Sequence, residues 1–207
     1  MNLRTDSVTF IAGKRRSGKS QFVKTVIWSK LTGNKVLCVF HDRKWEHYEE
    51  LCSCGDTVLV HDMMSLMKAD QAGHGKILYA PVSGDVEDFN ELCSYLFERG
   101  NSFLVVDEAQ SYANPGEMPP AYADIIRMGT VRGVGVCSLS QRPRGAHNMM
   151  ISEADLIISF RLQLFTDCQK IAQVVGEEAF KLNELPPYHF MSYDGHEVRW
   201  HDPINIR

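Results

Sequence analysis

Residues 13–20 read GKRRSGKS, which fits the pattern G-x-x-x-x-G-K-[ST]. An apolar, β-rich run at 8–12 (VTFIA) precedes this stretch, and residues 22–31 show the apolar spacing of a helix. The order strand, loop, helix places the glycine-rich turn at the positive end of a helix. Gly13 and Gly18 can adopt backbone conformations that other residues avoid, so successive amides can turn inward as an anion-binding nest. The stretch therefore predicts a phosphate-binding loop; the alternative is a glycine turn with an exposed lysine.

The last residues of this loop indicate the ligand. Lys19 would reach the β- and γ-phosphates of a nucleoside triphosphate, and the Ser20 hydroxyl would bind the Mg²⁺ that bridges them. A nucleoside triphosphate such as ATP, together with Mg²⁺, is therefore the expected ligand. The residues predicted to bind the nucleotide are Gly13, Lys14, Arg15, Arg16, Ser17, Gly18, Lys19, Ser20 and Gln21.

Length and composition restrict the class of protein but do not indicate a function. The chain has 207 residues, of which 44% are apolar and 23% charged, so we expect one soluble domain over residues 1–207. The formal net charge of −4 excludes a histone-like binder and limits any contact with nucleic acid to a local basic patch. No apolar run approaches the length of a membrane span, and no secretory signal opens the chain.

Short apolar runs alternate with helical stretches, which predicts an α/β fold with a mostly parallel sheet covered by helices on both faces. Apolar runs around Phe190 and Val198 predict a C-terminal antiparallel extension that turns at 194–195. The other expected strands are 8–12, 36–40 (leading to His41 and Asp42), 57–60, 76–80, 103–106, 134–140 and 156–160.

The sequence pattern predicts the helices less uniformly than the strands. Apolar residues from Phe89 to Phe97 fall on one helix face, and Gly100 closes that helix. A second helix is expected at 121–128. Thr166 and Gln169 form a capping-box pattern before a third helix, which ends at Gly176. Residues 63–75 have weak periodicity and predict a loop or a frayed helix.

An acidic pair follows one of the buried strands. Residues 103–106 (FLVV) lead directly into Asp107 and Glu108. On a strand neighbouring that of the phosphate loop, Asp107 would hold Mg²⁺ through a water, and Glu108 would project toward the γ-phosphate. Glu108 is then the predicted general base, which orients and deprotonates the attacking water.

A polar and basic segment follows the strand at 134–140. Gln141 carries an amide that can touch both the γ-phosphate and the attacking water, so it is predicted to sense the phosphate. Arg142, Arg144 and His147 crowd the loop beyond it and are the predicted DNA contacts. A solvated basic loop is the alternative.

Two further arginines lie between the acidic pair and Gln141. Arg127 or Arg132 could enter the site of a neighbouring subunit as an arginine finger. We favour Arg132, because it comes just before the next strand. The alternative is a surface arginine that pairs with Asp124 or with the carboxyl end of its own helix.

The ordered set GKRRSGKS, FLVVDEAQ and GVGVCSLSQRPRG, with SEADLIISFRL downstream, resembles the FtsK/HerA superfamily of DNA-pumping ATPases. It is most similar to the genome-packaging ATPases of tailless icosahedral viruses that contain a membrane. The resemblance extends from about residue 8 to residue 176. It supports the assignments of Lys19, Ser20, Asp107, Glu108 and Gln141.

The resemblance implies a RecA-like (ASCE) P-loop NTPase fold and a ring, expected to have six subunits, through which double-stranded DNA is pumped into a preformed capsid. It also implies capsid or membrane-vertex partners, and a location in the host cytoplasm or at the packaging vertex of the virion. Compared with the larger members, we expect this protein to lack a membrane anchor and an appended DNA-reading domain. Lys14, Arg15 and Arg16 are unusually bulky for this loop.

Three other functions would account for part of these motifs. A HerA-like DNA helicase or translocase of cellular or plasmid origin would carry the same motifs. A nucleotide kinase would share the phosphate loop, but a general base such as Glu108 beside its metal would promote wasteful hydrolysis. A guanine-nucleotide switch would need an N/T-K-x-D element, which this sequence lacks.

Overall fold

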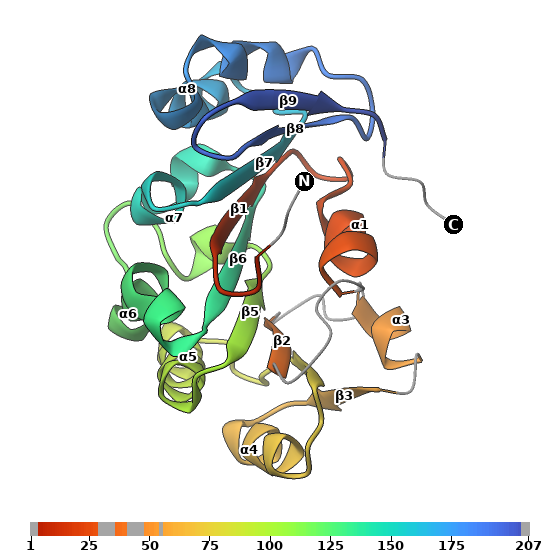
Figure 1. Cartoon of the computed structure of the whole chain (residues 1–207), viewed down its shortest axis with the longest axis vertical. Helices are drawn as coiled ribbons and strands as arrows, with labels where there is room; N and C mark the ends of the chain where they lie inside the picture. Colours follow the sequence, from red (N-terminus) through yellow and green to blue (C-terminus); the bar gives the residue numbers. More distant parts are fainter. Residues whose placement is uncertain (1–3, 29–35, 41–47, 54–55, 204–207) are drawn as a thin grey trace.

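The computed structural model describes residues 4–28, 36–40, 48–53 and 56–203. Within these residues, nine strands form a single sheet in the order β3-β4-β2-β5-β6-β1-β7-β8-β9 (Figure 1). The strands are β1 (Val8–Ala12), β2 (Val36–Phe40), β3 (Thr57–Val60), β4 (Lys76–Tyr79), β5 (Ser102–Val106), β6 (Gly135–Ser140), β7 (Leu156–Phe160), β8 (Phe190–Tyr193) and β9 (Val198–His201). The expected continuation of the second strand to His41 and Asp42, and the part of the expected first helix from residue 29 to residue 31, lie outside the described residues.

All pairs from β3 to β7 across the sheet are parallel, whereas β7 pairs with β8, and β8 with β9, in antiparallel fashion. The predicted mostly parallel sheet with a C-terminal antiparallel extension is therefore confirmed. One detail differs from expectation. The strand of the acidic pair, β5, is not next to β1, because β6 lies between them and pairs with both.

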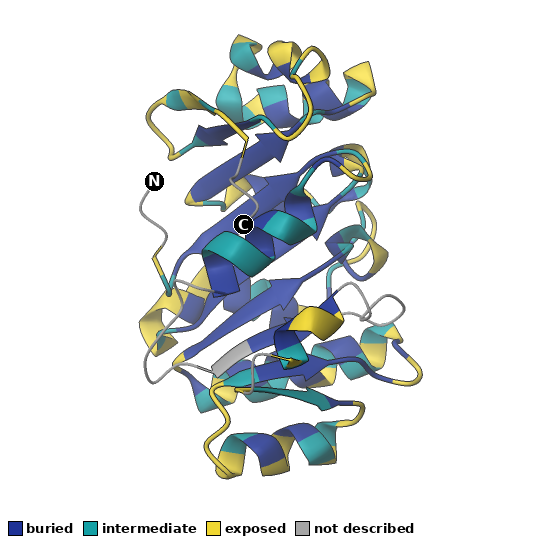
Figure 2. Ribbon diagram, turned by 90° about the vertical axis from the view of Figure 1, so that its right-hand side faces the viewer, coloured by how far each residue is buried: buried dark blue, intermediate teal, exposed yellow. Residues whose placement is uncertain are grey.

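Helices cover both faces of the sheet, and alternate strand residues point to the two layers (Figure 1). Ile11 packs beneath α1 (Lys19–Phe22), the π-helical turn η1 (Val23–Ile27) and α3 (Glu49–Cys52). Phe10, its neighbour on β1, belongs to the opposite core. The helices on that side are α4 (Met63–Gln71), α5 (Val86–Arg99), α6 (Pro120–Met128), α7 (Met149–Ser152) and α8 (Phe165–Val175). The central strands are buried on both faces (Figure 2), as continuous apolar runs in a parallel sheet require.

The predicted apolar face of α5 is confirmed. Phe89, Leu92, Cys93 and Leu96 are fully buried, and Phe97 packs at the edge of the same cluster. Asp85 caps the helix start by accepting a hydrogen bond from the amide of Asp88, and the helix ends at Gly100, whose φ is +68°.

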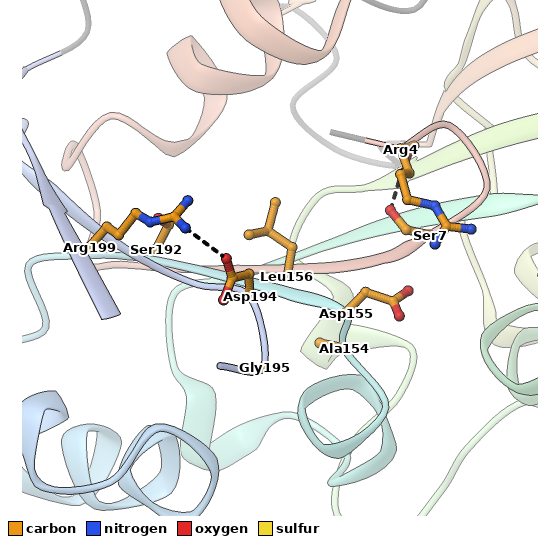
Figure 3. A pocket seen from close by; sticks show the side chains of 9 residues that line it. All are labelled: Arg4, Ser7, Ala154, Asp155, Leu156, Ser192, Asp194, Gly195 and Arg199. Carbon is orange, nitrogen blue, oxygen red and sulfur yellow. Dashed lines mark hydrogen bonds and ion pairs between the residues drawn. The ribbon is translucent and has the colours of Figure 1, made fainter. Parts of the chain in front are cut away.

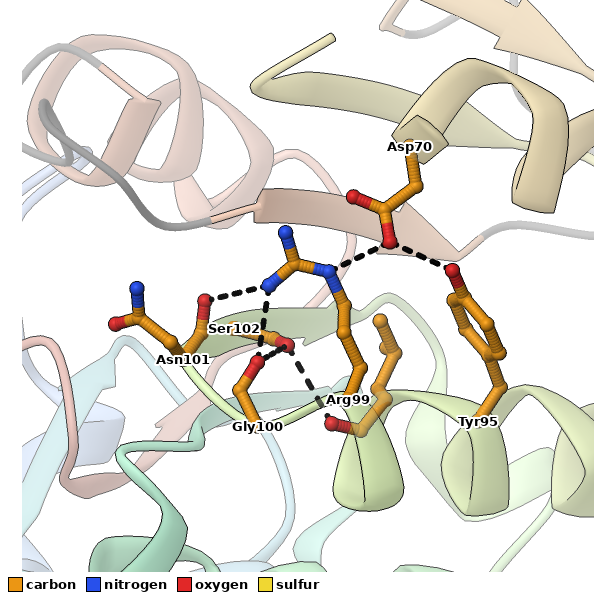
Figure 4. A network of polar contacts seen from close by, with 7 residues as sticks. Asp70, Tyr95, Arg99, Gly100, Asn101 and Ser102 are labelled. Atoms are coloured by element: carbon orange, nitrogen blue, oxygen red, sulfur yellow. Dashed lines mark hydrogen bonds and ion pairs between the residues drawn. The ribbon is translucent and has the colours of Figure 1, made fainter. Parts of the chain in front are cut away.

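Residues 63–71 form a regular helix, α4, rather than the loop or frayed helix expected for 63–75. Asp62 caps its start by accepting a hydrogen bond from the Ser65 amide. Near its end, Asp70 Oδ2 accepts hydrogen bonds from Tyr95 Oη and Arg99 Nε of α5, both at 2.6 Å (Figure 4). These polar contacts with α5 stabilise α4. Because the helix depends on residues that are distant in the sequence, the apolar periodicity of residues 63–75 predicted it only weakly.

The capping box predicted for α8 is wrong. The helix begins at Phe165, with Leu164 as the capping residue and no side-chain capping bond. Thr166 therefore lies inside the first turn. The acidic residue of that turn, Asp167, points to the loop that follows β6.

Candidate active site

Three motifs meet at one edge of the sheet because β1, β5 and β6 run parallel. The phosphate loop leaves β1, the acidic pair leaves β5, and Gln141 leaves the strand between them, β6. Parallel strands end at the same edge, so the sheet order brings together segments that are far apart in the sequence. This edge is the candidate active site.

The loop has the strained backbone that the two glycines were predicted to provide. Gly13 has a φ of +157° and Gly18 a φ of +117°. A Cβ on Gly13 would lie 2.5 Å from Ser17 Oγ and 2.8 Å from Phe160 Cβ, so no larger residue fits there. Arg16 also has a positive φ, +60°. A run of such conformations is what curls a backbone into an anion nest.

Both flanking strands anchor the loop. The Gly13 amide donates to Ser140 O at the end of β6 (3.2 Å), and the Lys14 amide donates to Arg161 O just after β7 (2.9 Å). Lys19 is buried, and its Nζ donates to Gly13 O (2.7 Å) and Lys14 O (3.2 Å). The ammonium group thus lies inside the curve of the loop, where the predicted phosphate contacts would be made.

Ser20 and Asp107 are in direct contact. Ser20 Oγ donates to Asp107 Oδ2 at 3.4 Å, and Tyr48 Oη donates to the same oxygen at 2.7 Å. Asp107 Oδ1 accepts the amide proton of Glu108 at 2.9 Å. The carboxylate is therefore fixed beside the serine that the sequence assigned to the same metal ion.

Glu108 follows in the left-handed region, with φ +53° and ψ +42°. A non-glycine residue in this conformation stores backbone strain, which is typical of functional positions. The strain arises because the chain turns directly from β5 into the short helix η3 (Ala109–Ser111). Gln141 Nε2 donates to Glu108 Oε1 at 2.6 Å. The predicted base and the predicted sensor are thus joined by a hydrogen bond.

A cavity of about 370 Å³ opens between these groups. It lies between the loop and Glu108, because Arg15 lines it together with Glu108 and Gln141. Gln110 and Arg142 complete the lining.

The site fits a magnesium-bound nucleoside triphosphate on three observations. Gly13 and Gly18 both have a positive φ, and a Cβ on Gly13 would clash with Ser17 Oγ. Ser17 Oγ is buried and, among the described residues, has no hydrogen-bond partner. The Ser20 hydroxyl and the Asp107 carboxylate supply the oxygen ligands that Mg²⁺ prefers. Gln21, at the start of α1, is half-buried next to them.

The basic loop lies at the same edge and surrounds η5 (Pro143–Gly145), with Arg142 just before this helix. Buried Asp167 holds it: Oδ2 forms an ion pair with Arg142 Nε at 3.2 Å, and Oδ1 accepts the Arg144 amide proton at 3.1 Å. Both arginines are exposed, whereas His147 is half-buried and its Nδ1 accepts the Met149 amide proton. Asp167 thus neutralises part of the positive charge predicted for this loop.

The arginines considered as fingers lie away from this edge in their own chain. Arg127 is exposed on α6, and Arg132 ends a separate short helix, η4 (Gly129–Arg132), at the amino end of β6. The Arg132 guanidinium stacks 4.7 Å from the Phe97 ring centre, and its Nη1 lies 3.4 Å from Glu98 O. Arg132 therefore contacts the carboxyl end of a helix, as in the alternative interpretation, although that helix is α5. The finger role needs a neighbouring subunit and stays a prediction.

A larger cavity, of about 500 Å³, lies at the opposite edge of the sheet (Figure 3). Asp155 precedes β7 there, and Arg199 Nη2 pairs with Asp194 Oδ2 at 3.4 Å. No residue that the sequence assigned to the site lines this cavity. Size alone therefore does not locate the active site.

Sequence reasoning missed three residues of the site. Tyr48 and Asp167 reach the edge only through folding, so no motif marks them. Gln110 lines the cavity and has a buried Oε1 without a hydrogen-bond partner among the described residues. Its position two residues after Glu108, in DEAQ, was the available signal.

The sheet order and this edge together define the fold of a RecA-like P-loop NTPase. Similar solved structures include the DNA-packaging ATPase B204 from Sulfolobus turreted icosahedral virus (22% identity, 98% of this chain and 100% of that chain, TM-score 0.81). The genome packaging NTPase B204 from Sulfolobus turreted icosahedral virus 2, in complex with ATP-gammaS, is another (21% identity, 98% and 100%, TM-score 0.80). VirB4 of Thermoanaerobacter pseudethanolicus is more distant (11% identity, 96% and 89%, TM-score 0.71).

These neighbours confirm the P-loop NTPase fold that the resemblance implied. No protein-family model matches the chain. No curated protein matches it in sequence either. Among the described residues, no helix has the length and apolar character needed to cross a membrane.

Proposed function

We propose that this protein hydrolyses ATP to drive double-stranded DNA through a ring of its own subunits, and that it packages a viral genome into a preformed capsid. The contact between Ser20 and Asp107 carries the hydrolytic part of the proposal, because it joins the phosphate loop to the acidic pair. The similarity in fold to genome-packaging NTPases from two viruses supports the DNA-packaging part.

In this proposal the loop amides and Lys19 hold the phosphates. Lys19 Nζ exchanges the carbonyl oxygens of Gly13 and Lys14 for phosphate oxygens. Ser20 and Asp107 hold Mg²⁺, which when bound offsets the negative charge on the phosphates. Tyr48 fixes the orientation of the Asp107 carboxylate.

Glu108 is the general base. It accepts a proton from a water molecule as the water oxygen bonds to the γ-phosphorus and the bond to ADP breaks. Gln141 keeps the Glu108 carboxylate in place through their 2.6 Å hydrogen bond and senses the γ-phosphate. Because Arg142 follows directly, a shift of Gln141 on phosphate release would move the basic loop.

The DNA contacts of the proposal are Arg142, Arg144 and His147. They lie at the same edge as the nucleotide site, so motion caused by hydrolysis can reach them without crossing the sheet. The ring, expected to be a hexamer, would work in the host cytoplasm and at the packaging vertex. Capsid or membrane-vertex proteins would dock it there.

The test is ATP hydrolysis measured with and without linear duplex DNA over a range of salt concentrations. We expect DNA to stimulate hydrolysis, and the stimulation to fall as salt rises, because phosphate contacts release counterions. Arg144→Ala should weaken the stimulation, and Lys19→Ala should abolish hydrolysis. Phosphate transfer to a nucleoside monophosphate would establish the kinase instead, and hydrolysis indifferent to DNA would contradict translocation.

A further inference from the structure

Tyr188 has a backbone conformation that its side chain disfavours. The amide of His189 donates to Pro186 O at 3.3 Å and closes a turn in which Tyr188 has a φ of +65°. Glycine or asparagine normally occupies this position, because a side chain with a positive φ is strained. A bulky aromatic residue held there indicates a functional site.

The turn places the tyrosine ring beside the phosphate loop. A Cβ built on Gly18 would lie 3.5 Å from Tyr188 Cδ1, and Tyr188 as a whole residue is 48% exposed. Phe190, two residues later, is buried and packs against Phe22 of α1 and Phe160 of β7, with ring centres 5.5 and 5.4 Å apart. This aromatic cluster anchors the turn, so the Tyr188 ring has a rigid support.

The sheet order gives the direction in which a bound nucleotide would extend. Glu108 and Gln141 leave β5 and β6, on one side of β1, so the γ-phosphate end lies on that side. Tyr188 comes just before β8, on the other side of β1. A nucleotide with its phosphates on the loop would extend its base toward the β7 and β8 side.

We propose that Tyr188 is the stacking platform for the base of the bound nucleotide. The proposal rests on the proposed function, since it takes a triphosphate on the loop as given. An exposed aromatic face binds a flat base by stacking, and stacking accepts any base because each has a π-face. The subsite therefore recognises a nucleobase without strong discrimination between adenine and guanine.

Isothermal titration of the full chain with ATP, GTP and inorganic tripolyphosphate, each with Mg²⁺, tests this subsite. Tyr188→Ala should weaken ATP and GTP binding by similar factors, about tenfold to a hundredfold, and leave tripolyphosphate binding unchanged. Tyr188→Phe should bind all three as the wild type does. Tyr193→Ala is the matched control, because Tyr193 lies at the far end of β8 from Tyr188, at the opposite edge of the sheet.

A folding defect is excluded by a second variant. Tyr188→Gly relieves the positive φ, so its melting temperature should be at or above that of Tyr188→Ala, with the same loss of ATP affinity. Unchanged ATP affinity in Tyr188→Ala, or equal losses for ATP and tripolyphosphate, would contradict the stacking role of Tyr188 and leave the proposed function intact. A wild-type chain that binds neither compound would instead remove the phosphate site, and with it the proposed function.

Discussion

At the scale of single residues, three hydrogen bonds fix the position of the Asp107 carboxylate. Its Oδ2 accepts from Tyr48 and Ser20, and its Oδ1 accepts from the Glu108 amide. Burial, followed by the nearby charge of Asp107, raises the pKa of Tyr48 well above its usual value. Its hydroxyl therefore stays protonated and donates at any physiological pH.

Tyr48→Phe should raise the Mg²⁺ concentration needed for tight ATP binding by about tenfold, because a hydrogen bond to a charged group contributes about 1.5–3 kcal/mol. Binding of ATP without Mg²⁺ should not change. The measurement is ATP affinity across a Mg²⁺ titration. Tyr122→Phe is the control: it removes a buried hydroxyl bonded to Ser138, and should lower stability without changing the Mg²⁺ dependence. An unaltered Mg²⁺ dependence in Tyr48→Phe would show that this hydroxyl does not position Asp107.

Motif residues were predictable at this scale because their chemistry depends on local spacing. Lys19 and Ser20 directly follow a loop whose glycines fix its shape, and Asp107 directly follows an apolar strand. Tyr48 and Tyr188 were not predictable, because only the folded sheet brings them to the loop.

At the scale of elements, α4 depends on contacts with α5 more than on its own sequence. Only Leu66 and Ala69 of this helix are buried, so its apolar face is narrow and its periodicity weak. The network of Asp70 with Tyr95 and Arg99 supplies the missing interactions (Figure 4). By contrast, α5 was predictable because its apolar face buries four residues.

Asp70→Asn should reduce the free energy of unfolding at pH 7 by about 1–3 kcal/mol. Burial alone would raise the pKa of Asp70, but the hydrogen bonds from Arg99 and Tyr95, together with the Arg99 charge, outweigh it and lower the pKa. A carboxyl with a lowered pKa in the folded state stabilises the fold above its unfolded pKa of about 3.9, and loses that contribution as pH falls through the folded pKa.

The difference between wild type and Asp70→Asn should therefore shrink as pH falls below about 4. Urea unfolding at a series of pH values measures it. Asp56→Asn serves as a control, because Asp56 pairs with Lys76 at an exposed position, and such pairs contribute about 0–1 kcal/mol. A constant difference across the pH range would show that the Asp70 charge does not stabilise α4.

At the scale of the whole molecule, the order of the strands brings the parts of the candidate site together. The sequence predicted alternating strands and helices, but not that β6 would lie between β1 and β5. Strand order depends on long-range packing, which leaves little trace in local periodicity. The insertion matters because it places Gln141 between the loop and Glu108.

In the proposed ring, an arginine from a neighbouring subunit would complete each active site. If Arg132 or Arg127 acts in trans, mixing the corresponding alanine variant with Lys19→Ala subunits should restore part of the ATPase activity lost in each. Arg132 would first have to leave the Phe97 ring and the Glu98 carbonyl. No recovery on mixing, with unchanged rates in the single arginine variants, would remove both residues from this role.

The central claim is that one edge of the sheet binds ATP and hydrolyses it with Glu108 as the base. The most direct test compares ATP affinity with the rate of phosphate release in Glu108→Gln, with the exposed Glu91→Gln on α5 as a control. The variant at Glu108 should bind ATP as the wild type does and release phosphate about 10²- to 10⁴-fold more slowly. Near-normal phosphate release by Glu108→Gln would contradict the claim.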